Sequence, residues 1–161
     1  MSTHTGLKLA LVLSFLAGAV PAGAQSLTGT WDIGNGTGWA KCRTVLVDGT
    51  SASSVYTLGP LEITQSGTAI YVRSLERALH YQGVVNLASN GAGAAIATSC
   101  DALTATATDV PGTFHFSKVT PLKNVLQGTF VGRWQNSGEI IACKFSATRT
   151  TMSDPLIAAC P

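Results

Sequence analysis

The side chains that could do chemistry are few and scattered in this 161-residue chain. Beyond residue 24 the histidines are His80 and His115, and neither lies in a metal-binding motif such as H-E-x-x-H. Gly-x-Ser-x-Gly is absent, so a serine hydrolase with a nucleophile elbow has no support. The acidic residues are spread thinly, and Arg73, Glu76 and Arg77 are interpreted as a solvated loop. We therefore expect no catalytic site, no metal site and no cofactor.

The first 24 residues have the features of a secretory signal peptide. Lys8 provides a positive charge, and residues 9–20 form an uncharged apolar stretch. Ala22-Gly23-Ala24 then supplies the small-x-small pattern of signal peptidase sites, which predicts cleavage before Gln25. The apolar run is too short to span about 30 Å of hydrocarbon comfortably, which disfavours a membrane anchor. We expect a periplasmic or extracellular protein.

Four cysteines follow the predicted signal peptide: Cys42, Cys100, Cys143 and Cys160. No pair has the C-x2-4-C spacing of a usual zinc site, and an even number of cysteines in an exported chain most simply forms two disulfides. Three pairings are possible, and the sequence does not choose among them. We favour Cys42 with Cys100 and Cys143 with Cys160, because the second bridge would tether an otherwise loose C-terminal tail.

Composition and turn signals predict an all-β domain over residues 25–150. The chain is 45% apolar and 11% charged with a net charge of +2. Charge this sparse and balanced argues against nucleic acid as a partner, because binding phosphates requires clustered Lys and Arg. Turn dipeptides such as Ser66-Gly67 separate runs rich in Val, Ile, Thr and aromatic residues, and the uncharged stretch Tyr81 to Cys100 is predicted to be a hairpin rather than a membrane span. The predicted strands are residues 28–33, 39–47, 56–65, 69–75, 79–87, 93–100, 112–119, 126–134 and 139–148.

Evenly spaced strands without helices favour an antiparallel eight-stranded up-and-down β-barrel, which leaves no open edge. The remaining residues, 151–161, are expected to form a short tail held by a disulfide. Ser153 or Asp154 could cap one or two helical turns there, over Leu156 to Cys160, with Pro155 at the first position.

The segment Leu27-Thr28-Gly29-Thr30-Trp31 resembles the opening motif of the lipocalins and of the wider calycin group, which includes avidin-like barrels. The resemblance implies that Trp31, preceded by Gly29, closes one end of a barrel. It also implies that an Arg from the end of the last strand packs across the indole. Arg149 is at that position and Arg133 is the other candidate; the pair would form a cation–π stack whose guanidinium could also reach backbone carbonyls.

The chain departs from these families in three places. Thr108-Asp109-Val110 lies where lipocalins often carry Thr-Asp-Tyr, but it lacks the aromatic residue. Residues 151–161 are too few for the helix that follows a lipocalin barrel. The residues after Trp31 do not reproduce the spacing of the polar biotin contacts in avidins. The resemblance therefore concerns architecture and not ligand identity.

Aromatic residues are distributed over most of the predicted strands. If they point inward beside the small residues of the segment 91–97, they would leave an apolar cavity of the kind that binds small molecules. Equally, the same rings could simply fill the barrel. The candidate ligand contacts are Tyr71, Tyr81, Phe114, Phe116, Phe130 and Trp134.

These observations favour a non-enzymatic, lipocalin-like binding protein for a small hydrophobic or amphipathic ligand. The alternative is an extracellular protein-interaction module, such as an enzyme inhibitor, that presents the loops around Asn35 and Asn90 to a partner protein. An enzyme ranks third. The sequence does not specify the ligand, the partner or the oligomeric state.

Overall fold

The computed structural model describes residues 26–34, 38–54, 56–77, 79–88, 91–100 and 109–160. The predicted signal peptide, the residues Asn35 and Asn90, and Thr108 of the Thr-Asp-Val segment lie outside this described part.

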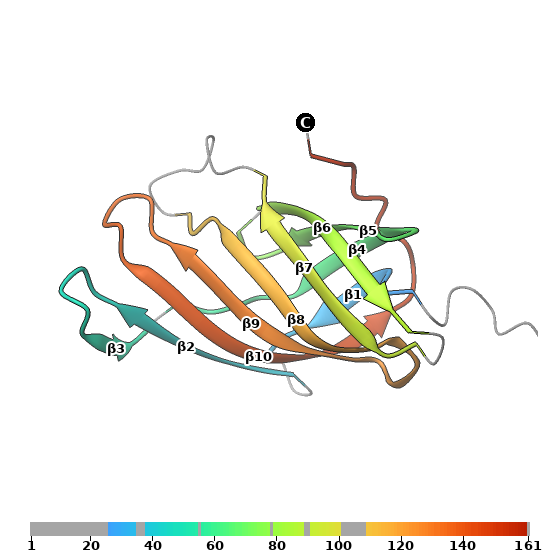
Figure 1. The fold of residues 1–161 in the computed structure, drawn as a ribbon, viewed down its shortest axis with the longest axis horizontal. Helices are drawn as coiled ribbons and strands as arrows, with labels where there is room; N and C mark the ends of the chain where they lie inside the picture. The colour runs from blue at the N-terminus through green and yellow to red at the C-terminus, as the bar shows by residue number, and fades with distance from the viewer. Residues whose placement is uncertain are drawn as a thin grey trace, which may run out of the picture.

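The described residues form ten β-strands, all paired antiparallel, and one short 3-10 helix (Figure 1). The elements are β1 (Gly29–Asp32), β2 (Trp39–Val45), β3 (Ser51–Ser53), β4 (Leu61–Ser66), β5 (Ala69–Ser74), β6 (His80–Leu87), β7 (Gly93–Ser99), β8 (Gly112–Thr120), η2 (Pro121–Lys123), β9 (Val125–Arg133) and β10 (Ile140–Thr151).

Eight of these strands close into a barrel. Strands β4 to β10 pair in chain order, and β1 pairs with β4 on one side and with β10 on the other. This is the antiparallel up-and-down barrel that the sequence predicts. The hairpins expected at Ser66-Gly67, within 81–100 and before residue 139 are β4–β5, β6–β7 and β9–β10.

Strands β1 and β2 share one edge of β10, which splits the barrel wall at one end. Residues 148–151 of β10 pair with β1, and residues 140–146 pair with β2. β1 pairs on its other edge with β4, whereas β2 pairs on its other edge with β3 and not with β4. In Figure 1, β2 and β3 extend away from β4 and β5. The chain therefore crosses toward β4 through residues 56–60.

The core lies inside the barrel, where alternate residues of each strand point inward. On β5, Ile70 and Val72 are fully buried while Tyr71 between them is half-buried on the outer face. On β8, Phe114 and Phe116 are buried and His115 is exposed. This period of two is the pattern that separates a barrel interior from its outer surface.

Two predicted elements are corrected. The strand predicted over 56–65 begins only at Leu61, because residues 56–60 cross the split wall where no partner strand is available. The helical turns predicted over Leu156 to Cys160 do not form; Leu156 has a φ of 53°, and its amide donates to Asp154 Oδ1 at 2.8 Å. The tail instead lies extended along the barrel, where the Ile157 amide donates to Thr64 Oγ1.

The disulfide pairing that we favoured is also wrong. The bridges are Cys42–Cys143 and Cys100–Cys160. Cys42 and Cys143 face each other directly on β2 and β10, with their Cα atoms 4.0 Å apart. The tail runs back past β4 and β6, where the Cys160 amide donates to Gln82 Oε1, and this path brings Cys160 to Cys100 at the end of β7. The tail is thus tethered, but to a different cysteine.

The part of the chain that the structure describes contains no helix of the length and hydrophobicity needed to cross a bilayer. The two disulfides indicate an oxidising compartment, extracellular or periplasmic.

Candidate functional site

One end of the barrel is closed by an indole and a guanidinium. Trp31 is fully buried on β1 and faces Arg149 on β10, whose Cζ atom lies 4.6 Å from the ring centroid. The indole Nε1 donates to the Leu27 carbonyl at 2.8 Å, and Arg149 Nη2 donates to the Ser26 carbonyl. The stack implied by the calycin resemblance is therefore present. Arg149 is buried, and this burial lowers the pKa of its guanidinium.

Gly29 allows this closure. It has a φ of 137°, and a Cβ atom there would lie 2.0 Å from the Thr151 carbonyl oxygen of β10. A side chain at this position would push β1 away from β10. Gly29, Trp31 and Arg149 thus lie together where the barrel closes.

Four of the six aromatic residues proposed as ligand contacts form a continuous cluster inside the barrel. Phe114 is central: its ring centroid lies 4.7 Å from that of Phe130, 4.9 Å from that of Tyr81 and 5.6 Å from that of Phe116. All four side chains are almost completely buried. Of the other two, Tyr71 lies on the outer face of β5, whereas Trp134, just beyond β9, is half-buried and packs against the core.

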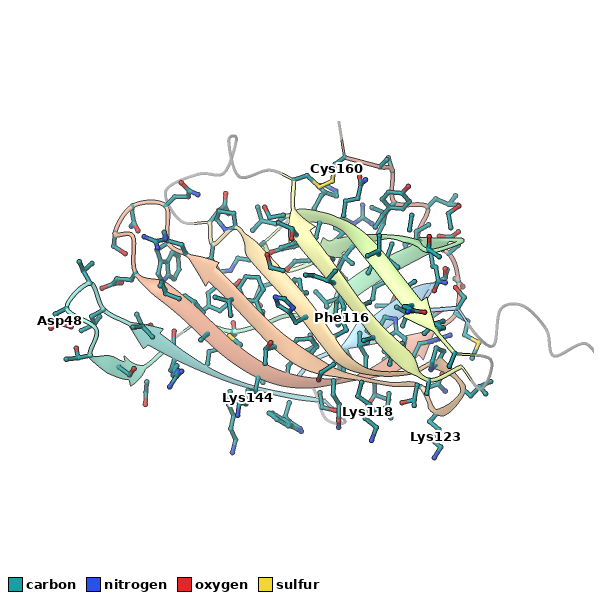
Figure 2. The ribbon with its side chains drawn as sticks, viewed as in Figure 1. Asp48, Phe116, Lys118, Lys123, Lys144 and Cys160 are labelled. Carbon is teal, nitrogen blue, oxygen red and sulfur yellow. A yellow bond between two sulfur atoms is a disulfide. The ribbon has the colours of Figure 1, made fainter. Side chains whose placement is uncertain are left out.

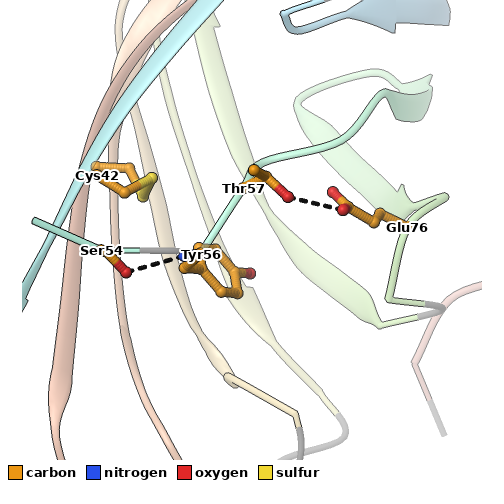
Figure 3. The surroundings of a disulfide bond; sticks show 6 residues. Cys42, Ser54, Tyr56, Thr57 and Glu76 are labelled. Carbon is orange, nitrogen blue, oxygen red and sulfur yellow. Dashed lines mark hydrogen bonds between the residues drawn. A yellow bond between two sulfur atoms is a disulfide. The ribbon is translucent and has the colours of Figure 1, made fainter.

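Tyr56 covers this cluster at the end opposite Trp31. Its ring stacks on Phe130 with centroids 6.0 Å apart and meets the edge of Trp134 at 5.9 Å. The Arg77 guanidinium carbon lies 5.2 Å from the ring centroid. Figure 3 shows Tyr56 between Cys42 of β2 and the Thr57–Glu76 contact, with its amide donating to Ser54 Oγ. Tyr56 therefore packs at the edge of the aromatic interior, next to the connection between β3 and β4.

Burial raises the pKa of the Tyr56 phenol to about 12. The nearby Glu76 and Asp109 carboxylates act in the same direction, and the Arg77 guanidinium partly opposes them. The folded protein therefore favours the protonated phenol, which presents a polar group at the edge of an apolar cluster.

A crevice of about 600 Å³ opens beside Tyr56. The connection from β3 to β4 forms one wall, and Thr57 Oγ1 donates to Glu76 Oε1 at 2.7 Å across it. Gly59 is required here, because a Cβ atom would lie 2.6 Å from Glu76 Cβ. The lining residues are Ile33, Gly34, Ala40, Tyr56, Thr57, Leu58, Gly59, Pro60, Leu75 and Glu76.

The sequence alone does not reveal this crevice. Tyr56 falls within a predicted strand, and Glu76 and Arg77 are interpreted there as a solvated loop. The available signal is Pro60, which cannot donate a backbone hydrogen bond and so argues against a regular central strand over 56–65.

Among the described residues, no three His, Cys, Asp or Glu side chains lie close enough together to bind a metal ion. No protein-family model, no curated protein and no solved structure matches the chain.

Proposed function

We propose that this is a secreted or periplasmic, non-enzymatic, lipocalin-like protein that binds a small hydrophobic or amphipathic ligand at the Tyr56 crevice. The observation that carries the proposal is the position of Tyr56, which lines the crevice and also stacks on Phe130 of the interior aromatic cluster. A ligand in the crevice would contact apolar surface that is continuous with the core.

The crevice has the properties of a small-molecule site. Its volume of about 600 Å³ lies within the range of roughly 300–1,000 Å³ that is usual for such sites. Leu58 and Leu75 provide apolar contacts, while the Thr57 hydroxyl and the Glu76 carboxylate provide polar ones. This combination suits an amphipathic molecule with its polar end near Glu76. Export fits both the signal peptide predicted from the sequence and the two disulfides.

The test uses N-phenyl-1-naphthylamine, a neutral apolar dye whose fluorescence increases on binding. Thr57→Trp would place a large ring in the crevice from an exposed position, without removing a core residue. We expect this variant to bind the dye at least about tenfold more weakly than the unmodified protein. The matched control is Leu122→Trp, which adds an indole at a position of η2 that is 54% exposed, and it should bind normally.

Native mass spectrometry of the protein purified from its own host gives the second measurement, and it should show a retained adduct that Thr57→Trp lacks. A clean unliganded mass together with no dye uptake would refute the proposed function.

A further inference from the structure

Four adjacent strands of the sheet, three from the barrel and β2 beside them, carry positive charge and no negative charge. Strands β2, β10, β9 and β8 contain no Asp or Glu. Figure 2 shows Lys118, Lys123 and Lys144 projecting from the same side of the molecule. The exposed cations of the four strands are Lys41, Arg43, Lys118, Arg133 and Lys144.

Two of these cations face each other. Lys41 on β2 is the direct cross-strand partner of Lys144 on β10. Like charges at directly opposed positions of an antiparallel pair destabilise the sheet. In the described part of the chain, no carboxylate forms an ion pair with either amine. An anion bound between the two amines would relieve this repulsion.

A groove of about 530 Å³ lies at this pair, on the outer surface of β2, β10 and β9. Trp39 and Val131 are 47% and 46% exposed there, and Ala142 lies between Arg43 and Val131 in the strand register. The groove thus has an apolar surface, and Lys41, Arg43 and Lys144 supply charge around it. An exposed indole next to unpaired cations is typical of a binding surface, because Trp and Arg are enriched where proteins bind ligands and partners.

We propose that this groove is a second ligand site, separate from the Tyr56 crevice, for an amphipathic organic anion. The apolar body of the ligand lies against Trp39 and Val131, and its sulfonate, carboxylate or phosphate lies between Lys41 and Lys144. A bare polyanion would leave the indole and Val131 without a partner. The concave groove also suits a small molecule better than a flat membrane surface.

The experiment compares 8-anilinonaphthalene-1-sulfonate with the neutral N-phenyl-1-naphthylamine, which lacks the sulfonate. Lys144→Gln and Lys41→Gln should each weaken binding of the sulfonate about five- to tenfold, because each removes one charge-assisted contact. Neither should change binding of the neutral dye. Lys123→Gln is the matched control, since it removes an equal charge from η2 outside the groove, and it should bind both dyes normally.

Three further readouts distinguish binding in this groove from binding in the Tyr56 crevice and from loss of the fold. Raising the salt concentration should weaken sulfonate binding, because the amines are exposed. Thr57→Trp, which fills the Tyr56 crevice, should leave sulfonate binding unchanged. The groove is therefore tested independently of the proposed function, which concerns the crevice. Lys144→Gln should have an unfolding midpoint equal to or above that of the unmodified protein, which shows that weaker binding does not come from unfolding.

The proposal is overturned if the sulfonate binds equally well to Lys144→Gln and to the unmodified protein. It is also overturned if Lys123→Gln weakens sulfonate binding as much as Lys144→Gln does. It is also overturned if the protein binds phosphatidylglycerol vesicles through these lysines but does not bind the free sulfonate. That result would identify a membrane-docking face instead.

Discussion

The Trp31 side chain has a structural role in closing the barrel. Its ring is fully buried, its indole nitrogen is hydrogen-bonded to the Leu27 carbonyl, and one face is covered by Arg149. The Leu27 carbonyl and the guanidinium together hold the N-terminal segment over the end of the barrel. An indole with these contacts acts as a packing element.

Replacement of Trp31 by Ala should therefore lower the free energy of unfolding by about 3–5 kcal/mol, through lost burial and the cavity left behind. Urea denaturation followed by far-UV circular dichroism measures the loss. Trp39→Ala is the control, because that side chain is 47% exposed and its removal should change stability by only about 0.5 kcal/mol. A loss below about 1 kcal/mol for Trp31→Ala would show that the ring does not close the barrel.

Tyr56 gives a prediction about pH. Its pKa is raised from 10.0 to about 12 in the folded protein, so the folded state keeps the phenol proton longer than the unfolded state does. The resulting stabilisation is complete below pH 10 and is lost as the pH rises to about 12. Over that interval the phenol should account for a decrease of about 2–3 kcal/mol in the free energy of unfolding.

Chemical denaturation at a series of pH values from 9 to about 12 measures this decrease. Tyr56→Phe should show a shallower fall, because Phe fills the same space and has no proton to lose. Identical pH profiles for the two proteins would mean that the Tyr56 phenol is solvated in the folded state.

At the scale of elements, the local signals predicted most of the barrel. Each of the nine predicted strands overlaps a strand of the structure, because turn dipeptides and alternation mark where strands lie, although the one over 56–65 begins five residues late. The failures occur where distant segments decide the outcome. Whether residues 56–60 form a strand depends on a partner, and the split between β1 and β2 removes it. β3 was missed because it is three residues long and fully exposed.

The disulfide pairing and the Tyr56 crevice could not be predicted from local sequence either, because both depend on residues that are far apart in the chain. Cys42 and Cys143 are 101 residues apart in the chain but directly opposed in the sheet, and only the register of β2 on β10 reveals this. The Trp31–Arg149 contact was predictable, because a family resemblance specified it. Pro60 was a local signal against a regular strand over 56–65, but nothing in the sequence indicated that the Tyr56 ring would stack on Phe130.

At the scale of the whole molecule, the barrel has one closed end and one split end. Next to Trp31, strand β1 pairs on both sides and the wall is continuous. At the other end β2 is bonded to β10, and β3 is bonded only to β2 through three register pairs. Stability against local opening should therefore differ between the two ends, because β3 has one partner strand and little buried surface.

Amide hydrogen exchange followed by mass spectrometry should show this gradient. We expect amides of β3 to exchange at least about 100-fold faster than those at the centres of β9 and β10, which are paired on both sides. Cys42→Ser combined with Cys143→Ser should speed exchange in β2 and leave the β4–β5 hairpin unchanged, because the bridge fixes β2 to β10 and does not touch that hairpin. Equal protection of β3 and β9 would contradict the low local stability expected for a strand with a single partner.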